Sequence, residues 1–183
     1  MTDVLLIAGS PTIQSRSGAV ITSLSERLEG CGLSTFTLRV RDLDAEALLH
    51  ARQDHPQLAD ALNQVARANS VIVATPVYKA SFSGLLKLFL DLLPQSALSG
   101  KAVLPAATAG TGAHLLAIDY ALKPVLSALG VLTFLPSLYI QDAHITQVNP
   151  PVFDPEVERR MTASVDALRL YLSRLTPVIG ELT

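Results

Sequence analysis

Residues 4–18 read Val4-Leu5-Leu6-Ile7-Ala8-Gly9-Ser10-Pro11-Thr12-Ile13-Gln14-Ser15-Arg16-Ser17-Gly18. The first five residues of this stretch are all apolar, which is typical of a central strand buried on both faces of a parallel sheet. Gly9-Ser10-Pro11 then ends the strand with a turn, and from Ser17 onward the apolar residues recur at helical spacing. The stretch therefore predicts a strand, a polar loop and a crossover helix, which together begin a βαβ unit.

The same alternation of short apolar runs and helical patterns continues along the chain, which indicates a parallel sheet. Further strands are predicted at 35–39, 71–75, 101–107 and 131–139, and further helices at 57–68, 84–93, 115–129 and 155–175. The segment 42–55 is too polar and irregular for a simple crossover, and the tail after Thr176 has no clear pattern. We expect one α/β domain over 1–183, a flavodoxin-like doubly wound five-stranded parallel sheet in the order 2-1-3-4-5 with helices on both faces.

The composition narrows the classes of partner. Hydrophobic residues make up 49% and charged residues 16% of the chain, so we expect some apolar surface to lie in homo-oligomer interfaces. The net charge of −2, without runs of like charge, argues against nucleic acid and anionic membranes. Apolar stretches end before the roughly 18 to 20 residues that a membrane span needs. No leader pattern follows Met1, and we expect a cytoplasmic protein.

The cysteine and histidine residues indicate neither a disulfide nor a metal site. Cys31 is the single cysteine, which excludes an intrachain disulfide, and we expect it to pack as a small hydrophobe where a helix ends. The four histidines are scattered, without cysteine or carboxylate neighbours at ligand spacing. No metal site is expected.

Three loops are the candidate binding elements, because ligands of open α/β sheets bind outside the carboxyl ends of the strands. The loop after the first strand carries Ser10, Ser15, Arg16 and Ser17 at a helix N-terminus, where the helix dipole and free N–H groups favour an anion. Neither the dinucleotide nor the nucleoside-triphosphate glycine motif is present, so a monophosphate fits best. The alternative is a plain turn in which Ser15 or Ser17 only caps the helix.

The loops after the third and fourth predicted strands are compatible with a flat ring. Pro76 and Val77 could support a heteroaromatic ring, with loop N–H groups at its polar edge. The alternative is a packed strand–helix joint in which Tyr78 is an ordinary half-buried aromatic. The loop 108–114 is small and rich in glycine, so its backbone can approach a ligand closely, although this signal is weak by itself.

Three runs of sequence carry a family resemblance. They are Ala8-Gly9-Ser10-Pro11 with Ser15-Arg16-Ser17, then Ala74-Thr75-Pro76-Val77-Tyr78-Lys79-Ala80-Ser81-Phe82-Ser83-Gly84, and Ala117-Ile118-Asp119-Tyr120-Ala121-Leu122-Lys123-Pro124-Val125-Leu126. These runs closely resemble the NAD(P)H-dependent FMN reductases of bacterial alkanesulfonate utilisation. The resemblance covers about the first 140 residues and fades after Gln141.

The resemblance implies that this chain reduces FMN with NADPH or NADH, and that a separate flavin-dependent monooxygenase uses the reduced flavin to desulfonate an organosulfonate. It places the FMN phosphate on Ser10, Ser15, Arg16 and Ser17. It places the isoalloxazine against Pro76, Val77, Tyr78, Lys79 and Ser81, with Thr108, Ala109, Gly110 and Thr111 at its other edge. No side chain need act as acid or base, since hydride passes between two stacked rings.

The resemblance also concerns the helix after the fourth strand. In sulfonate-linked members this helix carries a one-residue π-bulge with a tyrosine at the oligomer interface, and Tyr120 stands at the matching place. We therefore expect a homotetramer or homodimer in which Tyr120 assists flavin exchange. The alternative is an interfacial tyrosine that only packs.

Two rival functions share the expected fold. A flavodoxin-type electron carrier holds FMN tightly between aromatic rings and is strongly acidic, whereas this chain has no Trp, 4 Tyr, 5 Phe and a net charge of −2. An exchangeable flavin, as in a reductase, fits this composition better. An FMN-containing quinone or azo reductase is not distinguished by the residues, and neither are NADH and NADPH or the substrate of the partner monooxygenase.

Overall fold

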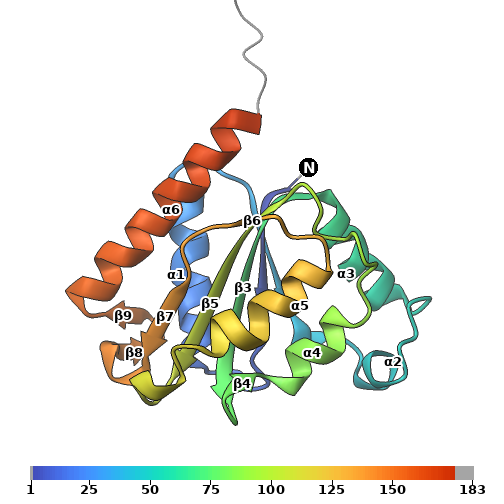
Figure 1. The fold of residues 1–183 in the computed structure, drawn as a ribbon, viewed down its shortest axis with the longest axis horizontal. Coiled ribbons are helices and arrows are strands. Elements are labelled where there is room, and N and C mark those ends of the chain that lie inside the picture. Colours follow the sequence, from blue (N-terminus) through green and yellow to red (C-terminus); the bar gives the residue numbers. More distant parts are fainter. Residues whose placement is uncertain (1, 176–183) are drawn as a thin grey trace, which may run out of the picture.

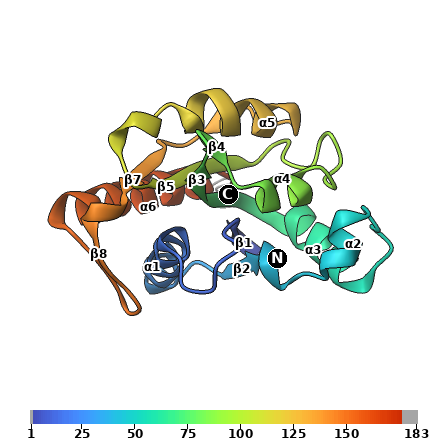
Figure 2. The same ribbon diagram turned by 90° about the horizontal axis from the view of Figure 1, so that it is seen from below.

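A central parallel sheet organises the chain in the computed structural model, which describes residues 2–175. Within these residues its path runs β2-β1-β3-β5-β6. Figure 1 labels β3, β5 and β6 of this path, and Figure 2 labels β1 and β2. The strands are β1 (Thr2–Ala8), β2 (Thr35–Arg39), β3 (Ala68–Tyr78), β5 (Ala102–Ala109), β6 (Thr133–Phe134) and β7 (Leu138–Gln141), with β7 pairing β5 farther along. The predicted flavodoxin-like order 2-1-3-4-5 is confirmed. The last predicted strand is divided into β6 and β7, because Pro136 between them has no N–H for the sheet.

Helices cover both faces of the sheet. Figure 2 separates α1 (Arg16–Gly30) and α6 (Pro155–Leu175) from α3 (Pro56–Arg67), α4 (Gly84–Leu90) and α5 (Lys123–Ala128). Alternate side chains of β1 enter two different cores: Val4 and Leu6 pack toward α1, while Leu5 and Ile7 pack toward α3 and α4. All four are fully buried, which explains why this strand is apolar throughout.

Several short elements complete the chain. They are the 3₁₀ helices η1 (Val40–Asp42), η2 (Gly112–His114) and η4 (Asp142–His144), the helix α2 (Ala45–Leu49), the strand β4 (Ser81–Phe82), and the antiparallel pair β8 (Ile145–Val148) and β9 (Pro151–Phe153). The helix predicted at 115–129 is instead a π-helix, η3 (Ile118–Leu122), followed by α5. Pro124 gives the physical reason, since it has no N–H to donate to the carbonyl of Tyr120 four residues earlier.

Three further predictions have different outcomes. The bounds of α6 agree with the predicted helix 155–175. The expectation that Cys31 packs as a small hydrophobe is wrong, since it is exposed at the C-cap of α1. The tail after Thr176 lies outside the described residues. Within 2–175, none of the helices has the length and apolar character needed to cross a membrane.

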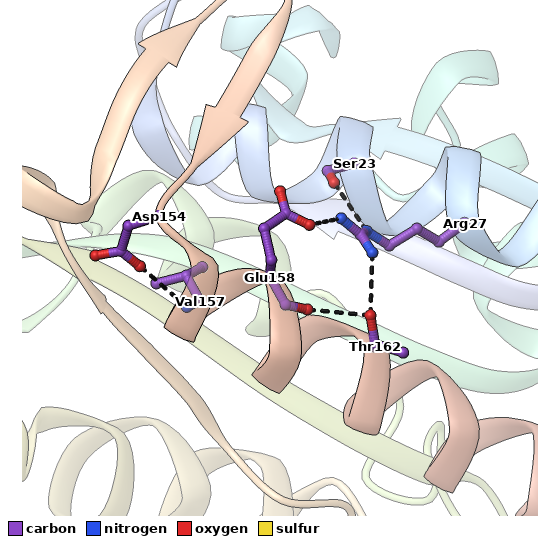
Figure 3. Close-up of polar contacts among 6 residues, drawn as sticks. All are labelled: Ser23, Arg27, Asp154, Val157, Glu158 and Thr162. Atoms are coloured by element: carbon purple, nitrogen blue, oxygen red, sulfur yellow. Dashed lines mark hydrogen bonds and ion pairs between the residues drawn. The ribbon is translucent and has the colours of Figure 1, made fainter.

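Polar contacts fasten α6 to α1 (Figure 3). The guanidinium of Arg27 in α1 donates to the hydroxyls of Ser23 (3.1 Å) and Thr162 (3.2 Å) and forms an ion pair with Glu158. Asp154 caps α6 by accepting from the N–H of Val157 at 3.0 Å. The contacts of Arg27 hold the second half of α1 against the first half of α6.

A glycine controls how closely α4 approaches the first strand. A Cβ at Gly9 would lie 2.8 Å from the Cβ of Leu86, which is closer than carbon atoms can pack. We predict that Gly9→Ala lowers the free energy of unfolding by about 1–3 kcal/mol, because α4 must shift to admit the methyl group. Chemical denaturation measures the loss.

Gly30→Ala is the matched control for that substitution. It adds the same methyl group at the end of α1, where no heavy atom lies within 4 Å of the new Cβ. Its stability should be unchanged, or higher by up to about 1 kcal/mol from helix propensity. Equal stabilities of the two variants would contradict the close-packing argument.

Candidate functional site

The three predicted loops meet at one edge of the sheet, which Figure 2 shows from below. Ala8 at the end of β1 pairs with Ala74 of β3, and Pro76 of β3 pairs with Thr108 of β5. Because the strands are parallel and adjacent, their carboxyl ends bring the loops together. We call this region the loop edge: it comprises the first loop (9–15), the β3–β4 hairpin (77–82) and the third loop (110–114).

Serines and an arginine lie in the first loop and the first turn of α1. Ser10 is buried, and its Oγ accepts from the N–H of Thr12 at 3.2 Å. Ser15 is the N-cap, and its Oγ accepts from the N–H of Gly18 at 3.0 Å, so the capping alternative holds for this residue. The Ser17 hydroxyl is buried without a hydrogen-bond partner. The Arg16 side chain is about half exposed.

A tight hairpin lies between β3 and β4. Tyr78 pairs with Ser81 in antiparallel fashion, so Lys79 and Ala80 form the two-residue turn. Their φ angles are 50° and 62°, the left-handed conformation that such turns require and that residues with a Cβ adopt at a cost of about 1–2 kcal/mol each. The sequence missed this hairpin because neither glycine nor asparagine occupies the turn. The side chain of Tyr78 is exposed beside it.

Buried hydrogen bonds join the first loop to the hairpin. The N–H of Gly9 donates to the carbonyl of Ala74 at 2.8 Å, and the hydroxyl of Ser83 donates to the carbonyl of Gly9. The same hydroxyl accepts from the N–H of Leu86 at 3.1 Å, which caps α4. The Thr75 hydroxyl accepts from the N–H of Ser83 at 3.0 Å. The two loops therefore share one rigid base.

The third loop continues β5 to the surface. Thr108 and Ala109 are buried, whereas Gly110 and Thr111 are exposed. The hydroxyl of Tyr139 in β7 donates to the carbonyl of Thr111 and fastens the loop to the sheet. Burial, together with the nearby charge of Asp142, raises the pKa of the Tyr139 phenol above its usual value of 10.0.

Sequence reasoning missed other residues at the loop edge. Arg41 follows β2, and its Nη1 donates to the carbonyl of Thr12 at 2.9 Å. Arg39, Arg41 and the first turn of α1 line a cavity of about 290 Å³. Asp142 follows β7, and its Oδ2 lies 3.5 Å from Nη1 of Arg16. Each residue closely follows a predicted strand, Arg41 the second and Asp142 the fifth. Because these strands also end at this edge of the sheet, their positions in the sequence could have indicated both residues.

The π-helix η3 lies beside the hairpin. Its Ile118 packs with Val77, Ala107 and Tyr139 in a small separate core. Tyr120 points away from this core and is 79% exposed, so the structure does not bring it into the loops. The predicted π-bulge is present in the described structure at the predicted place.

Comparison with known proteins identifies the family of the chain. The profile of the NADPH-dependent FMN reductase family matches residues 2–144. The chain belongs to this family. It is 45% identical to an FMN reductase (NADPH) of Pseudomonas putida, over 93% of this chain and 88% of that one, and 43% identical to an FMN reductase (NADPH) of Escherichia coli, over 98% and 94%. The apo structure of an NADH:FMN oxidoreductase (EMOB) superposes with a TM-score of 0.87 at 36% identity, over 100% and 95% of the two chains.

The protein is therefore an FMN reductase that uses NADPH or NADH, and the loop edge suits FMN. The first turn of α1 carries a buried, unpartnered hydroxyl on Ser17 and a half-exposed guanidinium on Arg16, and these residue types at a helix N-terminus fit a phosphate. FMN supplies the acceptor for hydride from the nicotinamide. Among residues 2–175, no group of three or more His, Cys, Asp or Glu side chains is placed to hold a metal ion.

Tyr139→Phe tests how the third loop is fastened. The variant loses the hydrogen bond to Thr111, and we predict a loss of about 0.5–1.5 kcal/mol in the free energy of unfolding. Because the folded-state pKa of Tyr139 is raised, the wild-type protein should also lose stability as the pH rises above about 10, and this part of the loss should be absent from the variant. Thermal melts against pH and ultraviolet titration of tyrosinate measure both effects. If the ultraviolet titration of the variant matches that of the wild-type protein at high pH, the raised pKa does not belong to Tyr139.

Proposed function

We propose that this FMN reductase hands reduced FMN to a separate flavin-dependent monooxygenase in organosulfur assimilation, and that residues 1–183 act as one FMN reductase domain in the cytoplasm. The observation that carries the proposal is the π-helix η3, which lies where the resemblance to the sulfonate-linked reductases requires it. Bulges of this kind are rare and frequently mark functional sites. Membership in a reductase family argues against a plain electron carrier.

The proposed FMN phosphate site is the start of α1, with Ser10, Ser15, Arg16 and Ser17 around it. A phosphate at this point would give the buried Ser17 hydroxyl an acceptor and would face a guanidinium. Ser15 already caps the helix because its Oγ accepts a hydrogen bond from Gly18. It would contact the phosphate by donating its hydroxyl hydrogen.

The proposed isoalloxazine site lies between the hairpin and the third loop. Residues on the hairpin side are Pro76, Val77, Tyr78, Lys79 and Ser81, and those on the other side are Thr108, Ala109, Gly110 and Thr111. The pairing of Pro76 with Thr108 places the two sets side by side. Their backbone groups would orient the ring for hydride transfer, which needs no acid or base from the protein.

A homotetramer or homodimer would cover the exposed apolar side chains near η3. Leu115 is 54%, Leu116 is 58% and Tyr120 is 79% exposed, and η3 lies against β4 of the hairpin. A surface of this kind favours association of copies of the chain. Flavin bound at the hairpin would then lie close to the subunit interface, where Tyr120 could assist its exchange.

The function is tested by steady-state oxidation of NADH and of NADPH by flavin-free protein, with and without FMN. We expect a rate of nucleotide oxidation that saturates with added FMN. We also expect the reduced flavin to reach a monooxygenase in coupled assays, including assays in which a dialysis membrane separates the two proteins. Turnover that needs an added quinone or azo dye, with FMN retained through gel filtration, would indicate the rival quinone or azo reductase. The same assay gives the preferred nucleotide.

Arg16→Ala tests the phosphate site. Since the guanidinium is about half exposed, we predict that its loss weakens FMN binding by about 3- to 10-fold and leaves riboflavin binding unchanged. Fluorescence titrations with the two flavins measure the difference. Equal weakening for both flavins would place the phosphate elsewhere.

Tyr120→Ala tests the exchange role, with Tyr120→Phe as the matched control that retains the ring. We predict that the alanine variant alters oligomeric state and the rate of flavin release, whereas the phenylalanine variant assembles normally. Sedimentation velocity and stopped-flow release measure the two properties. Unchanged assembly, flavin retention and turnover in the alanine variant would refute the role.

A further inference from the structure

An ion pair bridges the start of α1 and the end of β7. Arg16 is the first residue of α1, and Asp142 is the first residue of η4, directly after β7. Nη1 of Arg16 lies 3.5 Å from Oδ2 of Asp142, and the two side chains are 51% and 29% exposed. Neither residue belongs to the hydrophobic cores.

The carboxylate of Asp142 also faces the third loop. A Cβ at Gly110 would lie 3.9 Å from Oδ2 of Asp142, and the negative charge contributes to the raised pKa of Tyr139. Asp142 therefore stands where the first loop, the third loop and β7 meet. A flavin that spans the first and third loops would place its phosphate beside Arg16 and in the field of this carboxylate.

A second guanidinium contacts the first loop: Nη1 of Arg41 donates to the carbonyl of Thr12, and its Nε, buried without a hydrogen-bond partner, lies 3.4 Å from Oδ1 of Asp42. Arg16 differs because it stands on the first turn of α1, is about half exposed and faces Asp142. A paired Arg16 and Asp142 carry no net charge, so together they attract a phosphate dianion less than a single arginine would.

We infer that Asp142 competes with the FMN phosphate for Arg16 and thereby keeps FMN exchangeable. This inference rests on the proposed phosphate site. When FMN leaves, the carboxylate takes the place of the phosphate on the guanidinium, so Arg16 keeps an anionic partner throughout. Release therefore costs less free energy than it would without Asp142. A reductase whose product must reach another enzyme requires weak flavin binding of this kind.

Asp142→Asn is the direct test, because it removes the charge and nearly preserves the shape. The dissociation constant for FMN should fall by about two- to fivefold, the range for a partly exposed ion pair, and FMN should dissociate more slowly. Riboflavin, which has no phosphate, should bind as it does to the wild-type protein. Fluorescence titration and stopped-flow dissociation of oxidised flavin give these values without turnover.

Asp166→Asn is the matched control. Asp166 in α6 is paired with Arg169 at 3.8 Å and lies away from the loop edge, so the same change of charge should leave FMN affinity unaltered. Tightening of FMN in this control equal to that in Asp142→Asn would show a general charge effect and overturn the inference.

The Arg16→Ala background separates competition from direct repulsion. Competition predicts that Asp142→Asn increases FMN affinity only slightly once Arg16 is absent. The full increase in FMN affinity in that background overturns the inference. Weaker or unchanged FMN binding by Asp142→Asn alone also overturns it, since weaker binding would mean that the carboxylate orients the guanidinium. Failure of the proposed phosphate site is distinct, because Arg16→Ala would then affect FMN and riboflavin alike.

Discussion

Hydrogen bonds to the backbone of Gly9 connect the sheet to the loop edge. Its N–H donates to Ala74 and its carbonyl accepts from Ser83, whose hydroxyl also caps α4. The absence of a Cβ lets Leu86 pack directly against this backbone. These polar atoms are buried and paired, and buried polar groups are costly when unpaired. The end of β1, the end of β3 and the start of α4 therefore hold one fixed geometry.

The parts of the fold that depend on local burial were predictable. Val4–Ala8 is apolar at every position because both faces of β1 are covered, and this pattern is visible in the sequence without knowledge of partners. The amphipathic spacing of α6 and the polar loops at strand ends are equally local. Once the strand order was inferred, the convergence of three loops at one edge followed from parallel pairing.

The parts that depend on distant residues were not predictable. Lys79 and Ala80 have no preference for left-handed φ, and the pairing of β3 with β4 imposes it on them. Arg41 and Asp142 follow strands that looked peripheral, and only the three-dimensional arrangement brings them to the first loop. The flanking glycines of Cys31 indicated that α1 ends there. They did not indicate whether the side chain at that end is buried or exposed.

The loop edge consists of two layers that differ in burial. The Gly9, Ser83 and Thr75 layer is buried and fully hydrogen-bonded, so it defines where the loops stand. The layer above it, with Arg16, Tyr78 and Gly110, is exposed, and interactions of exposed charges are screened by water and salt. Under the proposed site, the buried layer would orient the flavin for hydride transfer between stacked rings. The contacts that Arg16 and Tyr78 contribute from the exposed layer would each add little affinity, which is compatible with the proposed exchange of flavin.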